Sequence, residues 1–290
     1  MILVTGARGF IGQSLMRALQ LKELPAKALG HDVNTPIAIN ETLADVDTVI
    51  HLASAEKRGR ARRLEAVDVQ GTRRLLAACQ KAEVRRFILV SRIGADPNAM
   101  YPLLRAKGRQ EQLVRRSDLP YTIVRSATVY GRHDHFLNNI VGLAAWSWPL
   151  VLMPGGGEMV MQPLWVEDLV RCLLHTLARY DLVERTIEVG GEERMPYKQM
   201  VLKALATARL SRLPLGAHPL VLRPISALLF AWWRRPPFNP FFLQRLAVPD
   251  ITDLDSVLHQ FNFRPVHFEQ NIAYLRRPGH RRRLIFGERN

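Results

Sequence analysis

In the first half of the chain, short apolar runs alternate with segments in which apolar residues recur every three or four positions. The apolar runs are typical of buried strands and lie at 1–5, 48–52, 86–91 and 121–125. The periodic segments predict amphipathic helices over 10–21, 66–81 and 107–116. This alternation predicts an α/β fold in which helices wrap a parallel sheet.

The second half of the chain is less regular after about residue 131. A helix is predicted over 166–180, because Glu167 and Asp168 in its first turn suit the positive end of a helix dipole. A short strand is predicted over 186–190. From Arg209 onward, prolines interrupt apolar and basic residues, and we predict a smaller, mainly helical C-terminal region.

Three glycines, at positions 6, 9 and 12, lie where the first predicted strand passes into the first predicted helix. Glycines at this place let backbone N–H groups and a helix N-terminus approach a pyrophosphate. The sequence therefore predicts a dinucleotide site, and the alternatives are a plain tight turn or a relic site that no longer binds. Ligands of open α/β sheets lie at the carboxyl ends of the strands. The predicted cofactor-binding residues are Gly6, Arg8, Gly9, Phe10, Ile11 and Gly12, with Ala53 and Ser54 after the second strand.

Six motifs follow one another in order: TGARGFIG (5–12), DTVIHLAS (47–54), VDVQGTRRLLAAC (67–79), RRFILVSRIGA (85–95), LPYTIVRSATVYG (119–131) and QPLWVEDL (162–169). On these motifs the chain resembles an atypical or extended short-chain dehydrogenase/reductase, of the NAD-dependent epimerase/dehydratase-like kind, over about residues 1–200. With PGGGEMVMQPLWVEDL, PFNPFFLQRL and FNFRP it looks most like NAD(P)-binding relatives of the complex I accessory subunit and, more loosely, like NmrA-like proteins. The resemblance implies a Rossmann-type, doubly wound parallel sheet and NAD(P) binding, but not by itself turnover.

The resemblance also suggests a domain organisation. Residues 1–200 would form the NAD(P)-binding Rossmann domain, with segment 132–165 contributing to the substrate region. Residues 201–275 would form a C-terminal helical region for substrate or docking, and 276–290 a basic tail.

The segment after the glycine loop is short, since Val49 comes only 37 positions after Gly12. A complete domain must fit a helix, two strands and a crossover there, so we expect a shortened strand 2 region. Asp32 has three interpretations: an acid that reads the adenosine ribose, part of an Asp-Val element with Val33 that the resemblance places over the adenine, or a solvated turn residue. We favour the second.

Arg8 lies inside the glycine loop. Its guanidinium suits the 2′-phosphate of NADP, or it faces solvent. NADP(H) is therefore slightly favoured over NAD(H).

The resemblance implies a catalytic tyrosine four residues before a lysine on one helix face, with a serine nearby. Lys107 aligns with that lysine and Ser91 with the serine, but Leu103 occupies the position of the tyrosine. Tyr101 lies six residues before Lys107 and precedes Pro102, which fits only a helix start. The catalytic candidates are therefore Ser91, Tyr101 and Lys107, with a displaced proton donor. The other role of Lys107 would be to hydrogen-bond the nicotinamide ribose, and the alternative is a surface lysine.

No metal site is predicted. His133 and His135 flank Asp134, but a Gly-x-x-Asp loop after a strand is normal in the family that the chain resembles. His51 is expected to be a core histidine of the cofactor strand. Cys79 and Cys172 lie in apolar helical segments, which excludes a disulfide scaffold and suits a reducing compartment.

The charge balance predicts a polyanionic partner. The 290 residues include 41 Lys and Arg against 26 Asp and Glu, a formal net charge of +15. Nucleic acid is disfavoured because no reader motif is present. Segment 220–233 is apolar, with tryptophans beside Arg234 and Arg235, and suits a membrane surface, a protein-docking face or internal core.

The sequence predicts neither a signal peptide nor a membrane span. We therefore expect a cytoplasmic protein, peripheral to the inner membrane face.

Three hypotheses result. The first is an NAD(P)(H)-binding protein with weak or lost redox activity, acting as an accessory, assembly or redox-sensing subunit at a membrane complex. The second is an active NADPH-dependent reductase or epimerase on a hydrophobic or nucleotide-linked substrate. The third is a membrane-surface subunit without nucleotide, which would require a blocked glycine loop.

Overall fold

The computed structural model describes residues 1–30, 39, 41–56, 60–217 and 241–276. It divides into two compact units. Unit 1 comprises the described parts of Met1–Ser126, Val166–Val189 and Ser256–Phe263. Unit 2 comprises the described parts of Ala127–Trp165, Gly190–Asp255 and Arg264–Asn290.

Unit 1 is built on a six-stranded sheet in which every neighbouring pair of strands is parallel. The strand order is β10-β5-β4-β3-β1-β2. The central strands are apolar on both faces, as expected of a sheet covered by helices on both sides. The strands are β1 (Ile2–Thr5), β2 (Ala26–Ala28), β3 (Thr48–His51), β4 (Arg86–Arg92), β5 (Tyr121–Ser126) and β10 (Arg185–Val189).

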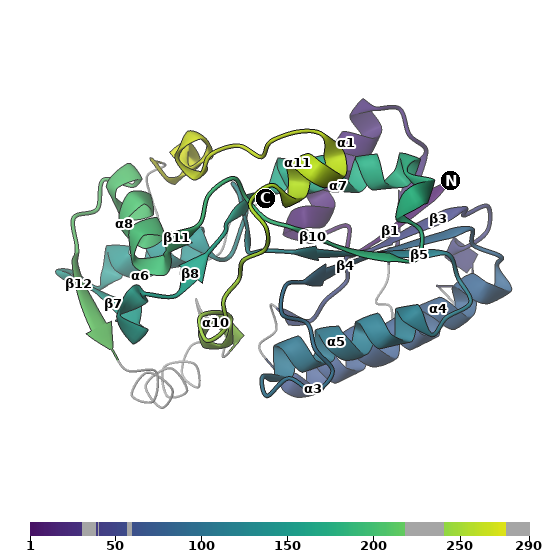
Figure 1. Cartoon of the computed structure of the whole chain (residues 1–290), viewed down its shortest axis with the longest axis horizontal. Helices are drawn as coiled ribbons and strands as arrows, with labels where there is room; N and C mark the ends of the chain where they lie inside the picture. Colours follow the sequence, from purple (N-terminus) through teal and green to yellow (C-terminus); the bar gives the residue numbers. More distant parts are fainter. Residues whose placement is uncertain (31–38, 40, 57–59, 218–240, 277–290) are drawn as a thin grey trace. The chain divides into compact units, whose positions relative to one another are not determined.

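Helices cover both faces of this sheet (Figure 1). One layer contains α1 (Phe10–Leu21), α7 (Val166–Ala178) and α11 (Ser256–Phe261), followed along the chain from α7 by the short 3₁₀ turn η4 (Tyr180–Leu182). The other layer contains α3 (Ala61–Leu64), the π-helical segment η2 (Glu65–Gly71), α4 (Thr72–Lys81) and α5 (Pro102–Arg115). The arrangement confirms the predicted Rossmann-type parallel sheet.

The predicted shortening after the glycine loop is confirmed. Strand β2 has three residues and lies at the edge of the sheet, parallel to β1. It is the only strand in the described part of the segment between α1 and β3. The physical reason is length, because too few residues are present for a second strand with its own crossover helix.

Local sequence sets the start of α5. Pro102 occupies the first turn, where its missing N–H costs nothing, and Tyr101 is the N-cap residue with an extended backbone. The prediction that Tyr101 precedes the helix is therefore confirmed. The helix begins earlier than the predicted 107, and its inward face carries Lys107 and Glu111 among apolar residues.

Unit 2 combines short strands with helices around its own apolar core. Its three two-stranded sheets pair β6 (Val129–Tyr130) with β9 (Leu164–Trp165), β7 (Leu150–Pro154) with β12 (Leu213–Ala217), and β8 (Val160–Met161) with β11 (Met195–Pro196). Its described helices are α6 (Leu137–Trp146), α8 (Tyr197–Thr207) and α10 (Phe241–Arg245), with 3₁₀ turns η3 (Gly155–Gly157), η5 (Phe268–Asn271) and η6 (Ala273–Arg276). Within the described ranges, no helix is long and apolar enough to cross a bilayer.

Candidate functional site

The glycine loop has no room for a side chain at two positions, Gly6 and Gly12. Gly6 has φ +68°, and a Cβ there would lie 2.8 Å from the backbone nitrogen of Ala53. At Gly12 a Cβ would lie 2.3 Å from the carbonyl oxygen of Gly6, so the first turn of α1 packs directly on the loop. The loop is closed by the N–H of Gly9, which donates to Gly6 O at 2.9 Å. The loop therefore lies close to the strand ends, as a pyrophosphate cradle requires.

The N-terminus of α1 is open to an anion. Its N-cap is Gly9, which supplies no capping side chain, and its first turn contains no acidic residue. The orphan N–H groups and the helix dipole there favour a phosphate group. Gly9 and Arg8 are exposed, while Phe10 and Ile11 are half-buried.

The end of β3 lies beside this loop. The Ala53 backbone is in close contact with Gly6, Ala53 is half-buried and Ser54 is exposed. The structure thus brings together the predicted cofactor-binding residues of the glycine loop and of segment 53–54. The predicted residues Asp32 and Val33 lie outside the described residues.

A buried hydrogen-bond chain crosses the sheet beneath the loop. His51 Nδ1 is 2.6 Å from Thr5 Oγ1, and His51 Nε2 is 2.8 Å from Thr72 Oγ1. Because Thr72 Oγ1 donates to the carbonyl oxygen of Asp68, it accepts from His51, which fixes the neutral tautomer with hydrogen on Nε2. Burial, with a contribution from the charge of Lys107, lowers the pKa of His51 to about 3. His51 is therefore a neutral core histidine.

Lys107 is buried and held by two partners. Its Nζ lies 2.8 Å from Oδ1 of Asp68 and donates to Oε1 of Gln110 at 3.2 Å. The other carboxylate oxygen of Asp68 accepts the N–H of Ala55 at 2.8 Å. Asp68 thus joins α5 to the segment after β3. The surface-lysine interpretation of Lys107 is wrong, because its side chain is only 7% exposed.

The other two catalytic candidates lie apart from Lys107. The Oγ of Ser91 donates to Glu111 Oε1 at 2.6 Å. Tyr101 is half-buried at the N-cap of α5, and its hydroxyl has no partner among the described residues. Leu103, four residues before Lys107, is buried. In this structure no tyrosine hydroxyl of the described chain is hydrogen-bonded to Lys107.

Glu111 forms a second buried ion cluster, which sequence reasoning missed. Its carboxylate lies 2.7 Å from Arg115 and 2.8 Å from Arg125, and accepts the Ser91 hydroxyl. The hydrogen bonds that Arg125 donates to Glu111 raise the pKa of Arg125 further. A charged residue at an inward position of a helix is the sequence signal that could have revealed both Glu111 and Asp68.

The histidines of segment 133–135 do not build a metal site with described residues. Asp134 is buried and caps α6, because its Oδ1 accepts the N–H groups of Phe136, Leu137 and Asn138. Its Oδ2 accepts the Tyr274 hydroxyl at 2.7 Å. The carboxylate is therefore fully used in holding the start of the helix.

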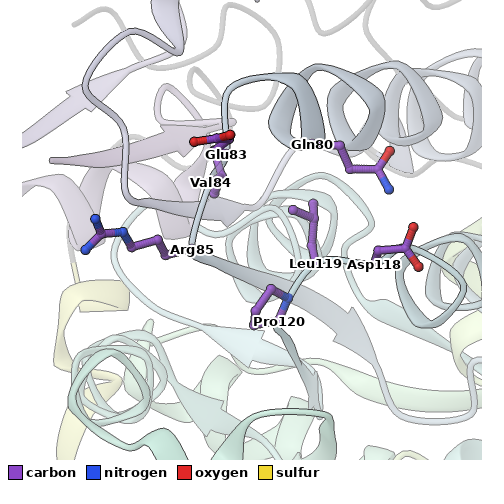
Figure 2. Close-up of a pocket in the computed structure, with 7 residues that line it drawn as sticks. All are labelled: Gln80, Glu83, Val84, Arg85, Asp118, Leu119 and Pro120. Carbon is purple, nitrogen blue, oxygen red and sulfur yellow. The ribbon is translucent and has the colours of Figure 1, made fainter.

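A depression of about 570 Å³ lies elsewhere on unit 1, and Figure 2 shows the residues that line it. It lies where Arg85 and Pro120 precede β4 and β5, at the amino ends of the strands. The glycine loop follows the carboxyl end of β1 in the same parallel sheet, so the depression lies at the opposite edge. Its lining residues are Gln80, Glu83, Val84, Arg85, Asp118, Leu119 and Pro120.

Comparison with known proteins agrees with the fold. The chain matches the family described as NAD(P)H-binding over residues 17–135. A solved structure of a short-chain dehydrogenase/reductase superfamily protein from Agrobacterium tumefaciens with bound NAD superposes with a TM-score of 0.69 over 95% of each chain, at 18% identity. A UDP-glucuronic acid 4-epimerase from Bacillus cereus gives 0.73 at 19% identity, over 95% of this chain and 98% of the other. The chain therefore has the fold of these structures and resembles NAD(P)H-binding proteins over residues 17–135.

Curated relatives are of several kinds. The rat mitochondrial NADH dehydrogenase [ubiquinone] 1 alpha subcomplex subunit 9 is 26% identical, over 85% of this chain and 66% of that protein. A ceramide reductase from Caulobacter vibrioides is 28% identical, over 58% and 57%. The photosystem II assembly factor Ycf39 from Synechocystis is 30% identical, over 40% and 35%. The chain thus spans less than two thirds of the length of each relative.

Proposed function

We propose that this protein binds NAD(P)(H) at the loop Gly6–Gly12 with weak or lost redox activity, and acts as an accessory, assembly or redox-sensing subunit at a membrane complex. The observation that carries the proposal is the buried ion pair between Lys107 and Asp68, 2.8 Å apart. It ties the lysine of the expected catalytic pair to a carboxylate rather than to a tyrosine.

The ion pair matters because of the proton chemistry that it opposes. A lysine activates a tyrosine by its positive charge, which lowers the tyrosine pKa. Here Asp68 compensates that charge in a buried place, and the position four residues before Lys107 holds the apolar Leu103. Ser91 is likewise occupied, since its hydroxyl proton is donated to Glu111. These contacts support the interpretation that Lys107 and Ser91 stabilise the fold and do not take part in catalysis.

The nucleotide side of the proposal has independent support. Gly6 and Gly12 have the close approaches that a pyrophosphate-binding loop needs, and the N-terminus of α1 is uncapped by any side chain. The exposed Arg8 in the loop favours the 2′-phosphate of NADP(H) over NAD(H). Because binding and turnover depend on different residues here, the first can persist without the second.

The accessory role is supported by the relatives. One is named as a subunit of NADH dehydrogenase and another as a photosystem II assembly factor, and both names refer to membrane complexes. We propose a cytoplasmic location, peripheral on the inner membrane face. In the proposed division of labour, 1–200 with the glycine loop holds the nucleotide, and the C-terminal region 201–275 serves docking.

Calorimetric titration with NADPH and NADH tests nucleotide binding. We expect saturable binding that Gly6→Ala abolishes, because a Cβ there would meet Ala53 and φ is +68°. Gly30→Ala is the matched control, since nothing lies within 4 Å of its Cβ position. The purified protein should oxidise NADPH no faster than buffer does when a quinone or a long-chain ketone is supplied. Absence of binding in the unmodified protein would overturn the proposal.

A second candidate is an active NADPH-dependent reductase or epimerase on a hydrophobic substrate. It is favoured by the half-buried Tyr101, whose hydroxyl has no partner among the described residues, and by the name of the Caulobacter relative. Under this candidate the protein reduces a long-chain ketone, and Tyr101→Phe abolishes turnover without changing nucleotide affinity. Under the first proposal Tyr101→Phe changes neither quantity.

A further inference from the structure

Unit 2 exposes six large apolar side chains around the paired strands β7 and β12. Trp148 is 74% exposed and Leu213 is 64% exposed. We call this group the apolar patch: Trp146, Trp148, Leu150, Leu152, Leu213 and Leu215. Contiguous exposed apolar groups of this size mark interaction sites on soluble proteins.

The fold assembles the patch from two distant segments. Helix α6 ends at Trp146, and a turn closed by the N–H of Leu150 on Ser147 O, at 2.7 Å, leads into β7. Strand β12 pairs with β7 in parallel, so that Leu213 lies opposite Leu150 and Leu215 opposite Leu152. The pairing is visible in Figure 1, where the two strands lie side by side. Residues more than 60 positions apart thereby form one surface.

The apolar character of the outer face is not a by-product of the core. Along β7, Val151 and Met153 point inward and are buried, while Leu150 and Leu152 alternate with them and are exposed. A strand with one solvated face normally carries polar residues on that face. Apolar residues on both faces of a strand are the pattern of a sheet that is covered on both sides.

The two segments that form the patch carry only positive charges. The segments that form it, 137–154 and 208–217, contain Arg209 and Arg212 but no Asp or Glu. Arg212 is held at the rim, because its Nε donates to Ala144 O at 2.6 Å and its Nη1 to Ser211 O at 2.7 Å. Tryptophan and arginine beside aliphatic side chains suit the boundary between lipid headgroups and acyl chains.

We propose that the apolar patch docks unit 2 on the surface of a phospholipid bilayer that contains anionic lipids. The inference rests on the proposed role at a membrane complex and names the surface that holds the protein there. The tryptophans and leucines enter the headgroup layer, and the two arginines meet lipid phosphates. A second copy of the chain fits less well, because a two-fold contact through this patch would bring the arginines of both copies together.

Flotation of the full-length protein with vesicles tests the proposal. We expect it to float with vesicles of phosphatidylcholine and phosphatidylglycerol, and less with phosphatidylcholine alone. The double variant Trp148→Ser/Leu213→Ser should weaken partitioning at least about tenfold, because two apolar anchors are lost. The matched control is Leu21→Ser/Met100→Ser, which removes two exposed apolar side chains of unit 1 and should float like the unmodified protein.

Fluorescence provides a second measurement that does not depend on how the serine variants fold. Brominated lipids should quench the tryptophan emission of the unmodified protein, and Trp146→Phe/Trp148→Phe should reduce the quenched fraction. The control Trp165→Phe, at a half-buried position, should not reduce that fraction.

Three results would overturn the proposal: no flotation, equal flotation of the patch variant, or a concentration-dependent dimer that the patch variant abolishes. A nucleotide titration of the same sample separates this inference from the proposed function, because nucleotide binding without flotation would refute only the lipid surface.

Discussion

Lys107 Nζ and Asp68 Oδ1 lie 2.8 Å apart in the interior of unit 1, and both side chains are almost completely withdrawn from water. Asp68 also accepts the backbone N–H of Ala55, which follows the strand end beside the glycine loop. The pair therefore links helix α5 to the edge of the proposed cofactor site. Its two charges depend on each other, since neither can be solvated alone.

Breaking this pair should be costly. We expect Asp68→Asn to lower the free energy of unfolding by about 3–5 kcal/mol, because it leaves the charge of Lys107 buried without a counter-ion. The double variant Asp68→Asn/Lys107→Gln should lose less than the sum of the two single losses, with a coupling of about 0.5–3 kcal/mol. Urea unfolding of the four proteins measures the cycle.

An exposed pair in the same helical layer is the control. Arg109 and Glu65 are 3.4 Å apart, with side chains about half exposed. Glu65→Gln should change the free energy of unfolding by at most about 1 kcal/mol. Additive losses in the Asp68 and Lys107 cycle would show that the two residues act independently.

The pattern of apolar residues was sufficient to predict the architecture of unit 1. Helix α1 occupies the predicted 10–21, and β3, β4 and β5 lie within one residue of their predicted ends. These elements could be predicted because the spacing of their apolar residues matches the faces that they bury in the folded unit. The displaced Tyr101 was also predictable, because Pro102 excludes it from the helix interior.

The contacts that decide how the site is used were not predictable in the same way. Asp68 reaches Lys107 across 39 positions of the chain, and it lies in η2, where π-helical geometry interrupts the predicted helix. The apolar patch depends on the pairing of β7 with β12, which no local pattern encodes. Such contacts arise from tertiary packing. The residues can be read from the sequence, but which of them meet cannot.

The burial of His51 predicts a pH dependence. Its pKa is lowered to about 3 by burial and by the charge of Lys107, from about 6.5 in the unfolded chain. Between these values the unfolded state binds one more proton than the folded state, so stability falls as the pH drops below 6.5. In this range His51 makes the free energy of unfolding fall by about 1.4 kcal/mol for each pH unit. Above about pH 7 this pH dependence vanishes.

Substitution isolates this contribution from those of other groups. His51→Gln keeps a donor and an acceptor for Thr72 and Thr5 but cannot take up a proton. We expect the difference in unfolding free energy between His51→Gln and the unmodified protein to shift in favour of the variant as the pH falls from 6.5 to 4. A difference that does not change with pH would contradict the assignment of a neutral buried imidazole.

The two thiols should be inert in the folded protein. Burial raises the pKa of Cys79 to about 12 and also raises that of Cys172. Ellman's reagent should therefore release no colour from native protein at pH 8 and two equivalents in guanidinium chloride. Fast reaction of one thiol in the native state would indicate that α4 or α7 opens locally.

Gly108 fixes how closely α5 approaches the loop after β4. A Cβ at this position would lie 2.1 Å from the carbonyl carbon of Asp96 and the nitrogen of Pro97, both backbone atoms that cannot rotate away. Gly108→Ala should therefore destabilise the protein by about 1–3 kcal/mol or more, despite the better helix propensity of alanine. Thermal unfolding measures the loss, and Gly30→Ala, which has open space around its Cβ, should leave the melting temperature nearly unchanged. Equal melting temperatures for both variants would mean that α5 does not lie against this loop.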